Sequence, residues 1–167
     1  MRPILLLLAH QLFDEDIQKA IRPSLAIEVF HNFTLLHDDI MDKAPVRRGK
    51  ATVHTKWNEN VAILSGDAML IQSYQYLCDL PSKQLKKCLA VFNEMALKVC
   101  EGQQYDMNFE IQAEVGMESY LKMIEYKTAV LLGASLKMGA IIGGSTEKQS
   151  KALYDCLLYT SDAADES

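Results

Sequence analysis

Residues 30–57 read FHNFTLLHDDIMDKAPVRRGKATVHTKW, and this stretch decides the fold and the chemistry that the chain can support. Its apolar half ends in Asp38, Asp39 and Asp42. Because residues four apart share one helix face, Asp38 and Asp42 point the same way and repel by roughly 0.2–0.5 kcal/mol. A divalent cation relieves this repulsion, since Mg²⁺ is usually held by one or two carboxylates together with substrate phosphates. The spacing therefore predicts Asp38 and Asp42 as Mg²⁺ ligands.

Two arginines follow the aspartates and predict a polyphosphate ligand. The guanidinium groups of Arg47 and Arg48 match phosphate oxygens in bidentate fashion. Gly49 permits a positive φ, so a turn there can direct both arginines back toward the metal. The alternative interpretation is an acidic helix end that meets only solvent, but negative charge at a helix C-terminus opposes the helix dipole. We therefore favour a metal-bound diphosphate.

The pattern DDxxD followed by RRG resembles the first aspartate-rich motif of the trans-isoprenyl diphosphate synthases, the polyprenyl synthetase family. Those enzymes are all-helical and condense isopentenyl diphosphate with an allylic diphosphate. The resemblance implies a Mg²⁺-dependent prenyltransferase of the isoprenoid synthase fold. It also implies that these two diphosphates are the binding partners, that the three aspartates of the motif are catalytic, and that the full-length protein is a homodimer.

Further residues match the family's motifs. Arg2-Pro3 resembles the end of a GGKxxRP motif whose first part is absent, which implies that the chain begins inside it. By resemblance, Arg2, His31 and Arg47 hold isopentenyl diphosphate, while Arg48 holds the allylic diphosphate. Phe33, five residues before Asp38, corresponds to the floor of the pocket for the growing chain and implies a farnesyl or geranylgeranyl product.

Two later segments also match. Gln103 and Asp106 fit the family pattern GQxxD, and they share a helix face because they are three residues apart. The resemblance implies that Gln103 faces the allylic group and that Asp106 is a third metal ligand. Lys127 and Thr128 match the family's KT pair, which contacts the allylic diphosphate. A lysine in an apolar stretch needs an anionic partner, which supports this assignment of Lys127.

Composition agrees with an all-α protein. Apolar residues recur mainly every three or four positions, which indicates amphipathic helices. The net charge of −5 and the lack of a basic tract argue against nucleic-acid binding. The apolar run at residues 4–9 is too short to span a bilayer, so no stable membrane insertion and a cytoplasmic location are expected. The four cysteines form no CxxC pair and are expected to be reduced and buried.

The resemblance covers about residues 2–155, roughly the N-terminal half of such an enzyme. We expect residues 1–155 to form a partial, truncated isoprenoid synthase domain and residues 156–167 to be a foreign tail, similar to a translated sequencing adapter. The second aspartate-rich motif of the family is not found after Lys127, so this chain alone is expected to be inactive. Two alternatives remain open: a class I terpene cyclase and a non-catalytic helical subunit that binds prenyl diphosphate.

Overall fold

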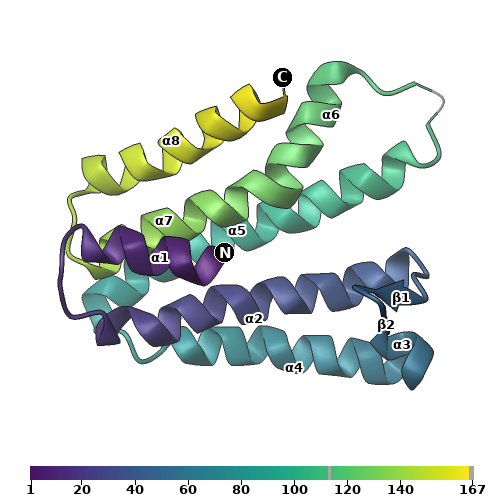
Figure 1. Ribbon diagram of the computed structural model, residues 1–167, viewed down its shortest axis with the longest axis horizontal. Helices are drawn as coiled ribbons and strands as arrows, with labels where there is room; N and C mark the ends of the chain where they lie inside the picture. The colour runs from purple at the N-terminus through teal and green to yellow at the C-terminus, as the bar shows by residue number, and fades with distance from the viewer. Residues whose placement is uncertain (113, 166–167) are drawn as a thin grey trace.

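The structure, a computed structural model, describes the backbone of residues 1–112 and 114–165 and the side chains of this range up to residue 158. It confirms the predicted all-α class, because long helices form the whole body of the molecule (Figure 1). The main helices are α1 (Arg2–Gln11), α2 (Gln18–Met41), α4 (Glu59–Leu77), α5 (Ser82–Phe109), α6 (Met117–Ile124), α7 (Val130–Ile142) and α8 (Glu147–Asp165).

An aromatic cluster joins α2, α4 and α5. Phe30 of α2 is buried and meets Phe92 of α5 edge to face, with ring centroids 5.2 Å apart. Tyr74 of α4 packs on the same Phe92 ring at 5.1 Å. Such edge-to-face contacts add about 0.5–1.5 kcal/mol beyond the burial of apolar area. Helices α2 and α4 lie side by side (Figure 1), and α5 meets both of them through the Phe92 ring.

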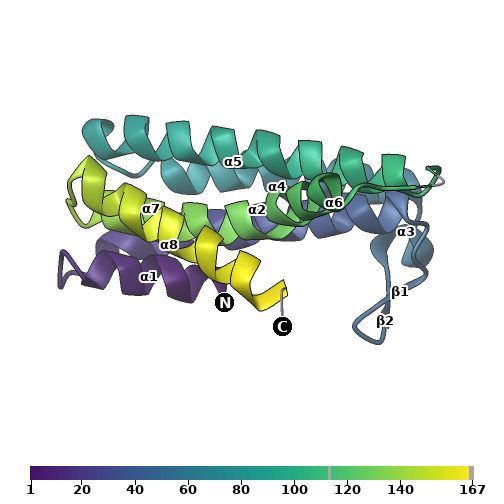
Figure 2. The ribbon, with the colours of Figure 1, turned by 90° about the horizontal axis from the view of Figure 1, so that it is seen from above.

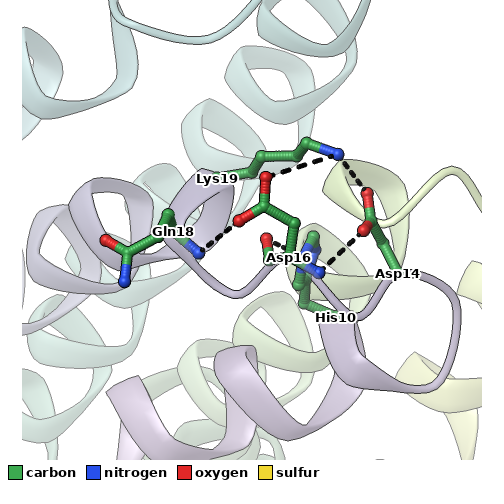
Figure 3. Close-up of polar contacts among 5 residues, drawn as sticks. All are labelled: His10, Asp14, Asp16, Gln18 and Lys19. Carbon is green, nitrogen blue, oxygen red and sulfur yellow. Dashed lines mark hydrogen bonds and ion pairs between the residues drawn. The ribbon is translucent and has the colours of Figure 1, made fainter.

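A polar turn connects α1 to α2 (Figure 3). The imidazole of the fully buried His10 lies 3.0 Å from the carbonyl oxygen of Asp16. The carboxylate of Asp14 accepts a hydrogen bond from the backbone N–H of Asp16 and pairs with Lys19 at 2.6 Å. The turn lets α1 pack against α2 and α7, and the N-terminus lies partway along the length of the bundle (Figure 1).

Helix α2 begins earlier than its sequence indicates. Pro23 favours a helix start near Ser24, yet the helix begins at Gln18 and carries Pro23 inside it. Proline lacks the N–H that would bond four residues back, so an interior proline normally weakens a helix. Here the ring of Pro23 is buried, and we infer that packing of the first turns offsets the lost hydrogen bond.

A short hairpin lies between α2 and α4. Strand β1 (Val46–Arg47) pairs antiparallel with β2 (Lys50–Ala51), and α3 (Val53–Lys56) follows. Two-residue hairpin turns of this kind need positive φ at both central positions. Gly49 has φ 77°, as predicted, and Arg48 has φ 52°, which the sequence did not indicate. The hairpin lies at the end of the bundle where α2 ends (Figures 1 and 2).

A π-helical turn, η1 (Glu125–Ala129), lies between α6 and α7. Helix α8 is capped by Thr146, whose backbone N–H and hydroxyl both donate to the Gln149 side chain. The helix then runs to Asp165. The prediction that residues 156–167 are foreign stays a prediction, since most of those side chains lie outside the described range.

The expectation of buried cysteines is wrong for most of them. Cys88 is buried in the core, whereas Cys78, Cys100 and Cys156 are exposed. An apolar sequence context identifies a buried helix but not which of its faces each thiol occupies. None of the helices in the described part of the chain combines the length and apolar character that crossing a membrane requires.

Candidate functional site

The carboxyl end of α2 faces the last turns of α5 across a small apolar cavity. The cavity has a volume of about 150 Å³ and is lined by Asp38, Gln103, Phe33 and Thr34 among others. Burial raises the pKa of the Asp38 carboxyl, and Asp42 adds to the rise, while the ammonium of Lys127 opposes it. This electrostatic coupling agrees with the prediction that Asp38 and Asp42 share a helix face. Asp38 is therefore a desolvated carboxylate that additional positive charge would stabilise.

The middle aspartate of the motif has a different environment. Asp39 is 7% exposed, and its carboxylate accepts a hydrogen bond from Nε of Arg47 at 2.6 Å. Successive helix residues are about 100° apart, so Asp39 faces the hairpin while Asp38 faces the cavity. The ion pair ties β1 to α2 and fixes the position of the Arg47 guanidinium, while Arg48 stays exposed in the hairpin turn.

Lys127 enters the site from η1. Its Nζ donates to the carboxylate of Asp106 on α5 in a close ion pair. The two helices can approach because Gly102 has no side chain: a Cβ there would lie 2.7 Å from the backbone nitrogen of Lys127. π-Helical turns are frequent at functional sites, and this one presents Lys127 toward both Asp106 and Asp38. Thr128, the other half of the predicted KT pair, is exposed on the same turn.

Gln103 is the clearest sign of an absent ligand. Its side chain is 8% exposed, and neither its amide nitrogen nor its amide oxygen has a hydrogen-bond partner among the described residues. Buried polar groups are nearly always hydrogen-bonded, so an orphaned amide at a cavity wall indicates a missing partner. Gln103 lines the same cavity as Asp38.

A second group of predicted residues gathers beside His31. Burial, followed by the positive charges of Arg2, Arg48 and Arg47, lowers the pKa of His31 to about 4. A histidine surrounded by guanidinium groups stays neutral and can still donate one hydrogen bond. Glu28 partly balances Arg2, whose own pKa is lowered by burial. The excess of cations makes this an attractive position for a polyanion.

The donor set fits Mg²⁺ in part. Asp38 and Asp42 offer the hard oxygen ligands that Mg²⁺ prefers, and a magnesium site built with substrate phosphates needs only one or two protein carboxylates. Among the side chains of residues 1–112 and 114–158, no group of three or more His, Cys, Asp and Glu could hold a metal ion. Asp106 forms an ion pair with Lys127, and its role as a metal ligand stays a prediction.

Sequence reasoning missed several residues of the cavity wall. His37 and Met41 of α2 and Cys100, Gln104 and Met107 of α5 line it beside the predicted residues. Their spacing of three and four along each helix is the available signal. That spacing marks a shared face without showing which helix lies opposite.

Solved structures share this fold. A crystal structure of geranylgeranyl pyrophosphate synthase is similar with a TM-score of 0.91 at 48% identity, covering 94% of this chain and 48% of that chain. The geranylgeranyl pyrophosphate synthetase from Pyrococcus horikoshii Ot3 matches with a TM-score of 0.91 at 39% identity, covering 95% of this chain and 49% of that chain. The fold is thus that of the all-α isoprenyl diphosphate synthases.

Sequence relatives identify the family. The family model described as polyprenyl synthetase matches residues 1–163, and the chain belongs to this family, as its motifs predict. The geranylgeranyl diphosphate synthase of Methanosarcina mazei is 39% identical over 155 residues, covering 92% of this chain and 48% of that protein. A (2E,6E)-farnesyl diphosphate synthase of Mycobacterium tuberculosis is 36% identical over 153 residues, covering 92% of this chain and 43% of that protein. The chain spans about half the length of the curated relatives it matches.

Proposed function

We propose that this chain forms the first aspartate-rich part of a Mg²⁺-dependent short-chain prenyltransferase, which condenses isopentenyl diphosphate with an allylic diphosphate. The observation that carries the proposal is the cavity shared by Asp38 and Gln103. In this cavity the desolvated carboxylate of Asp38 and the buried amide of Gln103, which has no hydrogen-bond partner among the described residues, lie beside apolar side chains. A Mg²⁺-bound diphosphate head with a hydrocarbon tail would satisfy all three features, because the cation meets the carboxylate. The names of the matched relatives support the same substrate class.

The allylic diphosphate would bind at the Asp38 end. Asp38 and Asp42 would hold Mg²⁺, which when bound neutralises the leaving pyrophosphate and so favours cleavage of the carbon–oxygen bond. The ammonium of Lys127 would be shared between Asp106 and the diphosphate, to which it would donate a hydrogen bond. Arg48 and Thr128 would contact the same diphosphate. Gln103 would orient its amide toward the allylic group, where positive charge develops.

Isopentenyl diphosphate would occupy the cationic group at Arg2, His31 and Arg47. A neutral His31 donates a hydrogen bond without adding to the repulsion among the guanidinium groups. Arg47 is already positioned by Asp39, so less side-chain entropy is lost when it binds a phosphate. Apolar side chains along the cavity, Phe33 included, would exclude water from the reacting carbon.

Binding to the chain tests this proposal directly. Isothermal titration with dimethylallyl S-thiolodiphosphate, which resists ionisation, should show Mg²⁺-dependent binding to the wild type. Asp38→Asn removes a ligand charge and should weaken that binding at least about tenfold, since hydrogen bonds and contacts to charged groups are worth roughly 1.5–3 kcal/mol. Glu15→Gln, an exposed position in the turn between α1 and α2, should leave it unchanged.

Further outcomes separate the alternatives. Isopentenyl diphosphate should bind alongside the allylic analogue without displacing it, because two separate cationic groups receive the two heads. Displacement would favour a cyclase, which needs a single diphosphate site. Mg²⁺-independent binding, or equal binding by Asp38→Asn, would contradict the proposal. The absence of prenyl transfer by this chain alone stays a prediction, tested by product formation from labelled isopentenyl diphosphate.

A further inference from the structure

Another cavity lies at the end of the bundle opposite the β1–β2 hairpin. Its volume is about 240 Å³, and its walls come from the start of α5, the end of α7 and the start of α8. Both views place these three segments far along the bundle from the hairpin (Figures 1 and 2). A smaller hollow of about 120 Å³ shares Lys87, Ile141 and Ser145 with it. None of the residues assigned to the two diphosphates lines either space, so this cavity is separate from the proposed prenyl transfer site.

The end of α7 fixes the position of Ser145 at this cavity. The backbone N–H of Ser145 donates to the carbonyl oxygen of Ala140 at 3.0 Å, and that of Gly144 donates to Ile141 at 3.1 Å. These are the two hydrogen bonds of a Schellman motif, which places a residue of positive φ just after the helix. Gly144 supplies it, with φ 91°. The backbone therefore holds Ser145 in place without help from its side chain.

The hydroxyl of Ser145 is left without a partner. Its oxygen is buried and forms no hydrogen bond within the described part of the chain. The neighbouring polar groups are already engaged: Thr146 and Gln149 bond to each other at the start of α8, and the Ser150 hydroxyl donates to the carbonyl oxygen of Glu147. Because buried hydroxyl groups are nearly always hydrogen-bonded, this one indicates a partner that occupies the cavity.

The charges around the cavity are mainly positive. Lys87 of α5 is exposed and Lys137 of α7 is half-buried, and neither forms an ion pair with a described residue. The ammonium of Lys137 lies 5.5 Å from the centre of the Tyr154 ring, which restricts its position. Lys83 adds a further positive charge in the adjoining hollow, and Glu147 is the acidic residue among the lining side chains. A small anion therefore fits this space better than a cation.

We propose that this cavity is a binding site for a small phosphate monoester. Such an anion carries about −1.5 to −2 charges at pH 7 and has three acceptor oxygens. Three donors are available to it, namely the ammonium groups of Lys87 and Lys137 and the hydroxyl of Ser145. A short apolar substituent on the phosphate contacts the apolar wall, which is formed by Ala90, Val91 and Ile141. A carboxylate has two oxygens and one charge, so it leaves one donor unsatisfied.

Amide NMR locates the binding of n-propyl phosphate, the probe of choice. The titration uses the isotope-labelled chain without Mg²⁺, so that metal-dependent binding at the aspartates does not contribute. The amide resonances of Gly144 and Ser145 should shift with a saturable dependence on probe concentration. The amide of Gly49 and the ring of His31 report separately on phosphate that binds among the arginines at the other end. Isothermal titration then gives the Kd.

Four variants test the three donors and the charge balance. Lys87→Gln should weaken binding about tenfold or more, since hydrogen bonds between charged groups are among the strongest. Ser145→Ala removes a neutral donor and should weaken it about threefold or more. Glu147→Gln removes a carboxylate that repels the phosphate and should strengthen binding. Lys86→Gln, on the next residue of α5 and lining neither space, is the matched control and should leave the Kd unchanged.

Several results would overturn the proposal. Shifts confined to Gly49 and His31 would mean that the phosphate binds only among the arginines. Equal losses in Lys87→Gln and Lys86→Gln would reduce the effect to general surface charge, and an unchanged Kd in Ser145→Ala would mean that the hydroxyl is satisfied by water. Binding of n-butyrate as tightly as n-propyl phosphate would contradict the assignment to a phosphate monoester. Circular dichroism identifies a variant that does not fold, and the wild-type titration decides the location of binding without any variant.

Discussion

The side chains at the carboxyl end of α2 differ in how their charge is balanced. Asp39 has the guanidinium of Arg47, and Asp106 has the ammonium of Lys127. Asp38 has no ion-pair partner within the described residues, and burial raises the pKa of its carboxyl in spite of Lys127 nearby. Of the three, Asp38 is the one that a bound cation stabilises most. Two neighbouring aspartates thus have different roles: Asp39 positions the Arg47 guanidinium, whereas Asp38 is expected to bind the cation.

His31 gives a prediction about pH. Its pKa is about 4 in the folded chain, compared with an ordinary value near 6.5. Between these values the unfolded chain binds more protons than the folded one, so the free energy of unfolding should fall as the pH drops from 6.5 to 4. Urea unfolding of the wild type and His31→Gln across this range measures the difference, which should appear as a shallower slope in the variant.

The same histidine reports on ligand binding. A diphosphate placed between Arg2 and Arg47 adds negative charge beside His31 and should raise its pKa. Proton NMR titration of the His31 ring, with and without pyrophosphate, follows this shift. A free-state pKa near 6.5 would show that the guanidinium groups do not converge on this residue.

At the scale of elements, the approach of η1 to α5 assembles the lysine part of the site. Gly102 allows the approach, and the π-helical turn directs Lys127 toward Asp106. The hairpin of β1 and β2 contributes Arg47, whose guanidinium pairs with Asp39 of α2. The π-helical turn and the hairpin are both short irregular elements that pack against the end of a long helix.

Gly102→Ala tests the helix approach. Its Cβ would lie 2.7 Å from the backbone nitrogen of Lys127 and 2.9 Å from the carbonyl carbon of Tyr126. Backbone atoms cannot move aside cheaply, so we expect a loss of about 1–3 kcal/mol in the free energy of unfolding, as in overpacked cores. Urea denaturation measures the loss. Gly116→Ala has nothing within 4 Å and should be nearly neutral, so equal effects of the two changes would contradict the close approach.

At the scale of the whole molecule, the aromatic cluster of Phe30, Phe92 and Tyr74 holds α2, α4 and α5 together. Phe30 and Tyr74 also line an apolar hollow of about 460 Å³, so the packing that stabilises the bundle also shapes this surface.

Phe30→Ala should show how much of the bundle depends on this cluster. The side chain is 1% exposed, and truncating such a ring costs about 3–5 kcal/mol. Because domains are stable by only about 5–15 kcal/mol, the variant should be close to unfolding. Leu25→Ala on the same helix is 43% exposed and should cost far less. Thermal and urea unfolding compare the two, and similar losses would mean that the cluster does not hold the bundle.

The periodicity of the sequence predicted the all-α class, and the spacing of DDxxD predicted that Asp38 and Asp42 act together. Both depend only on the repeat of one helix, which is the same in any fold. The interior position of Pro23, the hairpin and the π-helical turn were not predicted, because packing overrode local preference at each of them.

The sequence alone determined the helical class and the family motifs, because these follow from composition and from spacing within a single helix. Only the tertiary structure decided that Arg47 pairs with Asp39, that Lys127 pairs with Asp106, and that Asp38 and Gln103 line one cavity. These relations join segments far apart in the chain. Their distances depend on how helices pack, and no repeat along one helix contains that information.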